Sequence, residues 1–280
     1  MSLVLDHGGH MHGPSILVRS MSKPRSAPGG GEWQYHPRSD HHSKVACWGI
    51  LFDLLLESGV LRKHVASGAV IFGVNHEMTD FKHNRKKDLD MVLARPRGEA
   101  GGETFKGLVD KYNIALSTDE KKRLAALPDI HRGIVGSVQA ALEAKACMTE
   151  HGKARPRLYD ELNSSHETIH ASADEAIAVG FCMVNVAEVF RSPLRKVASK
   201  HKQPDAAGSV IDKIHEMPRR TKGGEQGFDA ISVVVVDCKN DGSPVKYSTA
   251  PPAPAAGSIY EYEIMIRRVA QLYASRFTSL

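Results

Sequence analysis

Strand-type apolar runs alternate with longer segments of helical period along this chain, and this alternation constrains the fold more than any other feature. The clearest strand-type run is Ile231-Ser232-Val233-Val234-Val235-Val236, and similar runs occupy residues 68–74, 86–94 and 138–147. Helices are predicted over residues 43–58, 173–190 and 258–277, with shorter ones over 117–128 and 210–215. Helices that alternate with strands are typical of an α/β fold, so we expect one central mixed β-sheet flanked by helices.

The first 40 residues differ from the rest of the chain. They are rich in His, Gly, Pro and Ser and have no sustained apolar period. Such a composition is typical of chain that cannot bury enough apolar surface to fold. We therefore expect residues 1–40 to be a flexible leader and residues 41–280 to form a single domain.

Composition excludes some classes of protein. The chain is 41% hydrophobic and 25% charged, as is usual for a globular protein, and its net charge of +5 is compatible with a phosphate-bearing partner without requiring one. None of the four cysteines forms a CxxC pair, so we expect buried, reduced thiols in a cytoplasmic protein. A run of roughly 18 apolar residues, the length that spans a membrane, does not occur.

Two predicted strands carry acids in apolar surroundings. Asp90 opens the apolar part of its strand, and Glu143 and Lys145 flank Ala144 in another. Because residues i and i+2 of a strand point to the same face, Glu143 and Lys145 should project together. Hydrolysis of a phosphodiester needs oxygen ligands for a divalent cation and a positive group near the developing negative charge. Asp90, Glu143 and Lys145 are therefore our candidate catalytic residues, with Lys145 expected to orient or deprotonate the attacking water.

The acid-x-Lys pattern by itself is not specific. It occurs five times, as Asp80/Lys82, Asp119/Lys121, Glu120/Lys122, Glu143/Lys145 and Asp237/Lys239. The serious rival is Asp237/Lys239, which ends the clearest strand. A turn sequence, Asn240-Asp241-Gly242, follows it, and a hairpin end explains the rival pair better. Glu143/Lys145 instead lies inside an apolar segment, where an acid and a lysine are costly unless they have a purpose.

Residues 88–93 (Asp-Leu-Asp-Met-Val-Leu) and 142–145 (Leu-Glu-Ala-Lys) resemble the PD-(D/E)XK nucleases, the fold group of many type II restriction endonucleases. The resemblance covers roughly residues 43–240 and implies a restriction-endonuclease-like fold. It implies that Asp90 and Glu143 bind Mg²⁺, for which Mn²⁺ can substitute, and that Lys145 positions the attacking water. The family's proline before the aspartate is Leu89 here, which leaves the choice between Asp88 and Asp90 open. We favour Asp90 because it directly precedes the apolar run.

The resemblance also implies the partners of the protein. The substrate would be double-stranded DNA, and a homodimer would cut both strands, with the predicted helices 173–190 and 258–277 as candidate interfaces. Basic residues near the three candidates are expected to bind DNA phosphates. These residues are Arg85, Lys86, Lys87, Arg155 and Arg157.

A competing motif implies another class of enzyme. Residues 166–170 spell HExxH, in which His166 and His170 would bind zinc and Glu167 would activate water, as in zinc metallopeptidases. Thr168 stands where such helices carry an apolar anchor, and this interpretation leaves Glu143 and Lys145 unexplained. A non-catalytic DNA-binding α/β protein is a third possibility.

Overall fold

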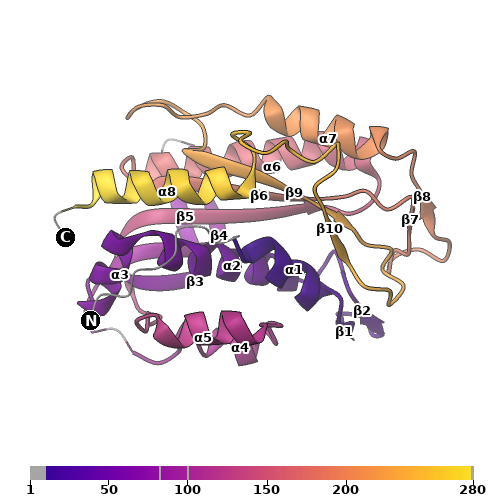
Figure 1. The fold of residues 1–280 in the computed structure, drawn as a ribbon. Helices are drawn as coiled ribbons and strands as arrows, with labels where there is room; N and C mark the ends of the chain where they lie inside the picture. Colours follow the sequence, from indigo (N-terminus) through magenta and orange to yellow (C-terminus); the bar gives the residue numbers. More distant parts are fainter. Residues whose placement is uncertain (1–10, 82, 100, 279–280) are drawn as a thin grey trace.

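The computed structural model describes residues 11–81, 83–99 and 101–278. Its centre is a six-stranded sheet (Figure 1). In spatial order the strands are β10 (Lys246–Ser248), β9 (Ala230–Asp237), β6 (Ile177–Asn185), β5 (Val135–Cys147), β4 (Arg85–Pro96) and β3 (Ile71–Asp80). Strands β3, β4 and β5 pair antiparallel, β5, β6 and β9 pair parallel, and β10 returns antiparallel to β9. The sheet is therefore mixed, as the sequence predicts.

Helices cover both faces of this sheet (Figure 1). One face packs against α1 (Gly13–Met21), α2 (His41–Glu57), α3 (Gly59–Ala66) and α8 (Tyr262–Arg276). The other face packs against α6 (His151–Ser172) and α7 (Asp205–His215). Two short helices, α4 (Leu108–Lys111) and α5 (Thr118–Ala126), lie in the connection from β4 to β5. There are also two small hairpins, one of β1 (Arg25–Ser26) with β2 (Glu32–Trp33) and one of β7 (Val189–Phe190) with β8 (Ser199–Lys200). Each face thus has its own apolar core.

The predicted helix over residues 173–190 is wrong. Residues 177–185 are strand β6, and every residue of it is buried. The strand lies between β5 and β9 with helices over both faces, and strands in that position are apolar throughout instead of alternating. Periodicity cannot distinguish such a run from a buried helix. The long helix of this region is α6, and residues 173–190 cannot form a helical dimer interface.

The prediction that residues 1–40 form a flexible leader is wrong for residues 11–40, the part that the structure describes. Residues 13–21 form α1, whose Ile16 and Met21 are fully buried. The Asp53 carboxylate on α2 accepts hydrogen bonds from the backbone N–H groups of His12 and Gly13 and so holds the start of α1. Residues 11–40 therefore belong to the domain, and residues 1–10 lie outside the described residues.

Other expectations are confirmed. The four cysteines are buried and free. Strand β9 ends at Asp237 and pairs with β10, so the rival pair Asp237/Lys239 does stand at the end of a hairpin. Among the described residues, no helix is both long enough and apolar enough to cross a membrane.

Candidate active site

The structure brings Asp90, Glu143 and Lys145 together on two adjacent strands. Met91 of β4 is paired with Leu142 of β5, so Asp90 and Glu143 occupy the next positions along the two strands. The Asp90 Oδ2 atom accepts a hydrogen bond of 2.9 Å from the backbone N–H of Ala144. The Lys145 Nζ atom is 2.8 Å from Glu143 Oε1. The convergence expected from the sequence is therefore present.

A break in the β3–β4 hairpin explains how Asp90 reaches β5. Alternate residues of a regular strand face the same way, yet Met91 packs into one core and Leu89 into the other. On β3, Asn75 lies opposite Asp90, between the pairs Val74–Met91 and His76–Leu89. Its φ of 50° is in the left-handed region. Both strands thus change face at this pair. We infer that the change leaves the Asp90 carboxylate free to bind the backbone of β5.

The first turn of α2 holds the other oxygen of Asp90. Ser43 Oγ donates a hydrogen bond of 2.8 Å to Asp90 Oδ1, and Lys44 Nζ lies 3.6 Å from the same atom. Lys44 is only 3% exposed, and its ammonium also donates to Asn75 Oδ1. Ser43 and Lys44 stand 47 and 46 residues before Asp90 in the chain, and no local sequence pattern connects them with it.

Glu143 is a buried carboxylate with one unsatisfied oxygen. The residue is 2% exposed, and its Oε1 atom lies 2.8 Å from Lys145 Nζ and 3.8 Å from Lys87 Nζ. Its Oε2 atom is buried and has no hydrogen-bond partner among the described residues. Burial raises the pKa of Glu143, and the negative charge of Asp90 raises it further, against the opposing effect of Lys145 and Lys87. An ionised oxygen in this position is costly unless a cation or a donor meets it.

The two lysines of the site differ in their electrostatics. Burial opposes the charged form of Lys145, but the carboxylates of Glu143 and Glu161 outweigh it and raise the lysine's pKa. For Lys87 burial dominates and lowers the pKa. Glu161 on α6 contacts both lysines: its Oε2 lies 3.6 Å from Lys145 Nζ, and its backbone carbonyl accepts a 2.7 Å hydrogen bond from Lys87 Nζ. Sequence reasoning missed Glu161, because an acid on a polar helix carries no distinctive signal.

Asp88, the alternative to Asp90, lies elsewhere on the strand. It is exposed and stands opposite Glu77 of β3. The carboxylate that reaches the backbone between Glu143 and Lys145 is that of Asp90. The geometry therefore favours Asp90.

The basic residues expected to bind DNA separate into two groups. Lys87 is partly buried within the site, and Arg157 lies at its margin, 82% exposed and 2.6 Å from Glu161. Arg155 is exposed on the same helix turn. Arg85 and Lys86 instead pair with acids outside the site: Arg85 Nη2 lies 2.9 Å from Asp80 and 2.8 Å from Glu167, and Lys86 Nζ lies 2.8 Å from Glu77.

The two histidines of the HExxH sequence bind different neighbours. His166 Nε2 lies 3.0 Å from Asn163 Oδ1, while Glu167 is bonded to Asn163 and Arg85. His170 Nε2 donates to the Gly227 carbonyl at 2.9 Å, and its Nδ1 accepts from Arg220. Over residues 11–278, apart from the two undescribed positions 82 and 100, no three His, Cys, Asp or Glu side chains are grouped to hold a metal. His170 therefore has both ring nitrogens bonded, whereas the Nδ1 atom of His166 is buried and has no hydrogen-bond partner among the described residues.

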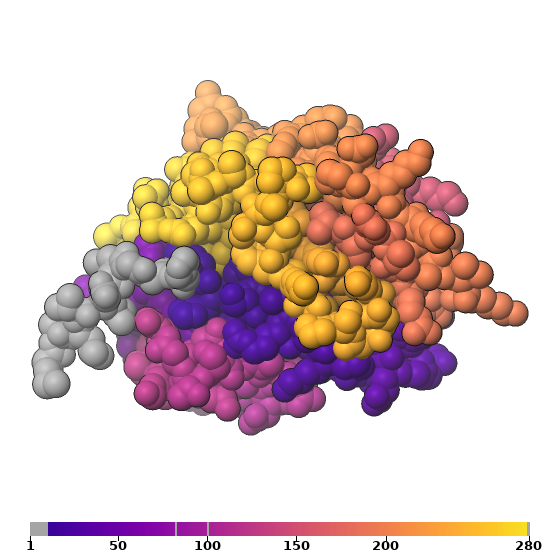
Figure 2. Space-filling model, turned by 45° about the vertical axis from the view of Figure 1, so that its right-hand side comes forward, coloured from indigo at the N-terminus to yellow at the C-terminus, as the bar shows by residue number. Residues whose placement is uncertain are grey.

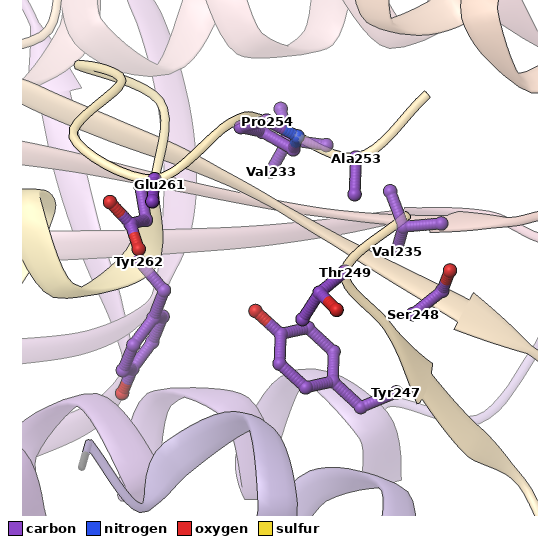
Figure 3. A pocket seen from close by; sticks show the side chains of 10 residues that line it. Val233, Val235, Tyr247, Ser248, Thr249, Ala253, Pro254, Glu261 and Tyr262 are labelled. Atoms are coloured by element: carbon purple, nitrogen blue, oxygen red, sulfur yellow. The ribbon is translucent and has the colours of Figure 1, made fainter. Parts of the chain in front are cut away.

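The structure also has a small cavity, whose lining side chains are shown in Figure 3. It has a volume of about 170 Å³ and lies between β9, β10 and the connection to α8. Tyr247 and Glu261 are among the side chains that line it, and Asp90, Glu143 and Lys145 are not. The volume is below the roughly 300 Å³ at which small-molecule sites begin. The cavity is therefore separate from the candidate site.

Comparison of the chain with protein-family models, with curated proteins and with solved structures gives no match.

Proposed function

We propose that this protein is a divalent-metal-dependent endonuclease that hydrolyses phosphodiester bonds of double-stranded DNA. The observation that carries the proposal is the buried Oε2 atom of Glu143, which has no donor among the described residues. The other oxygen of this carboxylate contacts Lys145, and the negative charge of Asp90 acts on the group. The proposal includes a restriction-endonuclease-like fold of the PD-(D/E)XK group, a role as a type II restriction enzyme and a cytoplasmic location.

The residues present fit a hard cation. Mg²⁺ binds oxygen ligands, typically one or two carboxylates together with water and substrate phosphates, and Mn²⁺ accepts the same ligands. Asp90 and Glu143 would hold the ion, and Glu143 Oε2 would gain the positive partner that it lacks. When bound, such an ion activates water and neutralises charge on the scissile phosphate. Ser43 and the Ala144 N–H keep the Asp90 carboxylate in position.

Lys145 has the properties of a charged hydrogen-bond donor. Because its pKa is raised, the side chain is an ammonium ion at neutral pH. An ammonium ion cannot accept a proton from water. Lys145 would therefore orient the attacking water and stabilise negative charge on the phosphate, and a solvent water molecule would accept the proton of the attacking water.

Cutting both strands of a duplex at one locus takes two such sites. We therefore propose a homodimer, in which each protomer supplies one set of Asp90, Glu143 and Lys145. Every side chain of the set comes from one chain, so a single protomer would still nick one strand.

Cleavage of a supercoiled plasmid tests the proposal. With Mg²⁺ the wild-type protein should convert supercoiled plasmid to nicked and linear forms, and a chelator should stop the reaction. Lys145→Ala should reduce the rate by about 10²-fold or more, because a charge contact worth several kcal/mol is lost. The matched control is Lys121→Ala, from the exposed acid-x-Lys pair Asp119/Lys121 on α5, which should leave the rate unchanged. Equal rates for wild type and Lys145→Ala would refute the proposal.

A further inference from the structure

A basic segment projects from the molecule between β6 and α7. Residues 189–202, here called the basic arm, include β7 and β8 and contain five lysines and arginines but no aspartate or glutamate. Figures 1 and 2 show this part of the chain at one end of the molecule, beyond the sheet. All five cationic side chains are exposed: Arg191, Arg195, Lys196, Lys200 and Lys202.

The base of the basic arm contacts the end of the strand that carries the candidate site. Strand β5 ends at Cys147, two residues after Lys145. In the turn that follows, Glu150 forms a 2.6 Å ion pair with Arg195, and Thr149 Oγ1 lies 3.0 Å from His201 Nε2. Both halves of the arm therefore contact the chain just beyond the catalytic strand.

A row of rings joins the arm to the Asp90 side of the site. Phe190 of β7 packs edge-on against Tyr35 with ring centroids 6.3 Å apart, and Tyr35 contacts His42 at 5.0 Å. His42 is followed in α2 by Ser43, the residue that donates to Asp90. Asn240 fixes the same region, because its side-chain amide donates to the backbone carbonyls of Tyr35 and Arg191. The arm is thus held beside the site.

Acids neutralise little of the charge of the arm. In the arm, Arg195 pairs with Glu150, and the other four cations have no ion pair with any residue that the structure describes. Like charges crowded on one segment repel each other unless a polyanion meets them.

We propose that the basic arm binds the phosphate backbone of duplex DNA and holds it against the candidate site. This inference rests on the proposed function for the identity of the polyanion, because the arm adjoins Lys145 and Asp90. The exposed Leu194 and Val197 lie among the cations, and a basic surface with apolar side chains can also bind an anionic membrane. Binding to anionic vesicles is therefore one outcome of the test.

The test measures DNA binding without cleavage. Fluorescence anisotropy of a labelled duplex, in chelator, gives the Kd at several salt concentrations for wild type and for a variant with Arg191, Lys196, Lys200 and Lys202 changed to Gln. Each lost phosphate contact lowers the slope of log K against log salt by about 0.9, so the slope should fall by up to about 3.6. The Kd at 0.1 M salt should rise by about tenfold or more.

The control variant removes the same charge elsewhere. It changes four exposed cations of other elements to Gln: Lys63, Arg97, Lys121 and Lys122. Its Kd should stay within about twofold of the wild-type value. The proposal is overturned if both variants weaken binding equally, if the wild type does not bind duplex DNA, or if the arm binds vesicles of anionic lipid and not DNA.

Failure of the arm and failure of the nuclease proposal have different signatures. Binding in chelator does not depend on catalysis, so a protein that binds DNA through the arm but never cuts it would refute only the nuclease. A protein that cuts with Mg²⁺ while the arm variant binds and cuts as the wild type does would refute only the arm.

Discussion

Glu143 shows, at the scale of one residue, how burial and charge compete in this protein. Its carboxylate is 2% exposed, one oxygen contacts Lys145, and the other has no donor among the described residues. Burial raises its pKa, as does the neighbouring Asp90. Groups with perturbed pKa values gather at functional sites, where a destabilising placement is retained because the reaction needs it.

The first prediction concerns the stability of the metal-free protein. A carboxyl whose pKa is raised by folding contributes stability that is fully present below its unfolded pKa and is lost as the pH rises through its folded pKa. Glu143→Gln mimics the protonated form at every pH. By calorimetry in chelator, the Tm difference between Glu143→Gln and the wild type should shift in favour of the variant as the pH rises from 4 to 8. A difference that shifts in favour of the wild type over this range would contradict this account.

The second prediction separates the two aspartates of β4. Asp90→Asn should slow plasmid cleavage by about 10²-fold or more, because a metal ligand worth several kcal/mol is lost. Asp88→Asn should change the rate by less than about threefold, because this side chain is exposed and stands opposite Glu77. The two rates are measured under identical Mg²⁺ concentrations. The reverse order of effects would assign the site to Asp88.

At the scale of elements, the site is completed by helices that the sequence does not connect with it. The strands β4 and β5 were predictable, because Asp90 and Glu143 stand in apolar runs of strand type. The contributions of α2 and α6 were not, because Ser43 and Glu161 meet the site only through tertiary contacts. Local patterns carry no information on such contacts.

The wrong prediction of a helix over residues 173–190, where the structure has strand β6 preceded by helix α6, also arises because the local pattern is uninformative. The inner face of α6 includes buried His166, Thr168 and His170, so its apolar stripe is broken and the segment looks polar. Strand β6 is buried on both faces and shows no alternation. Each element lacks the periodic signal that would have identified it.

The third prediction concerns Glu161 as a positioning residue on α6. Its carboxylate helps to raise the pKa of Lys145, so Glu161→Gln should lower that pKa. If catalysis needs protonated Lys145, the alkaline limb of the pH–rate profile moves to lower pH, while the rate at neutral pH, where Lys145 stays protonated, changes by less than about threefold. Glu167→Gln is the matched control on the same helix, since Glu167 pairs with Arg85 instead. An unchanged alkaline limb in Glu161→Gln would remove it from the site.

At the scale of the whole molecule, the N-terminal segment is part of the fold. The sequence predicted a flexible leader because residues 1–40 as a group are polar and rich in Gly and Pro. That average conceals α1, a short helix whose apolar residues complete the core under α2. The contact is close, since a Cβ atom added to Gly49 of α2 would lie 2.9 Å from the Cα of Gly13.

The fourth prediction follows from this packing. Ile16→Ala should lower the free energy of unfolding by about 2–5 kcal/mol, because Ile16 is fully buried and the substitution leaves a cavity. Ile134→Ala, at a position that is 68% exposed, should change it by less than about 0.5 kcal/mol. Urea denaturation measures both. Equal values would show that α1 does not contribute to the folded core.

The central claim is that Asp90, Glu143 and Lys145 act as one catalytic unit, and a double-mutant cycle on the cleavage rate tests it most directly. Single-turnover rates with Mg²⁺ are compared for wild type, Glu143→Gln, Lys145→Ala and the double variant. Residues that act as a unit are strongly non-additive. We predict that each single variant loses about 10²-fold or more, and that the double variant is hardly slower than either. Two results would contradict a shared site. One is a Glu143→Gln rate equal to that of the wild type, and the other is a fold-loss in the double variant equal to the product of the two single fold-losses.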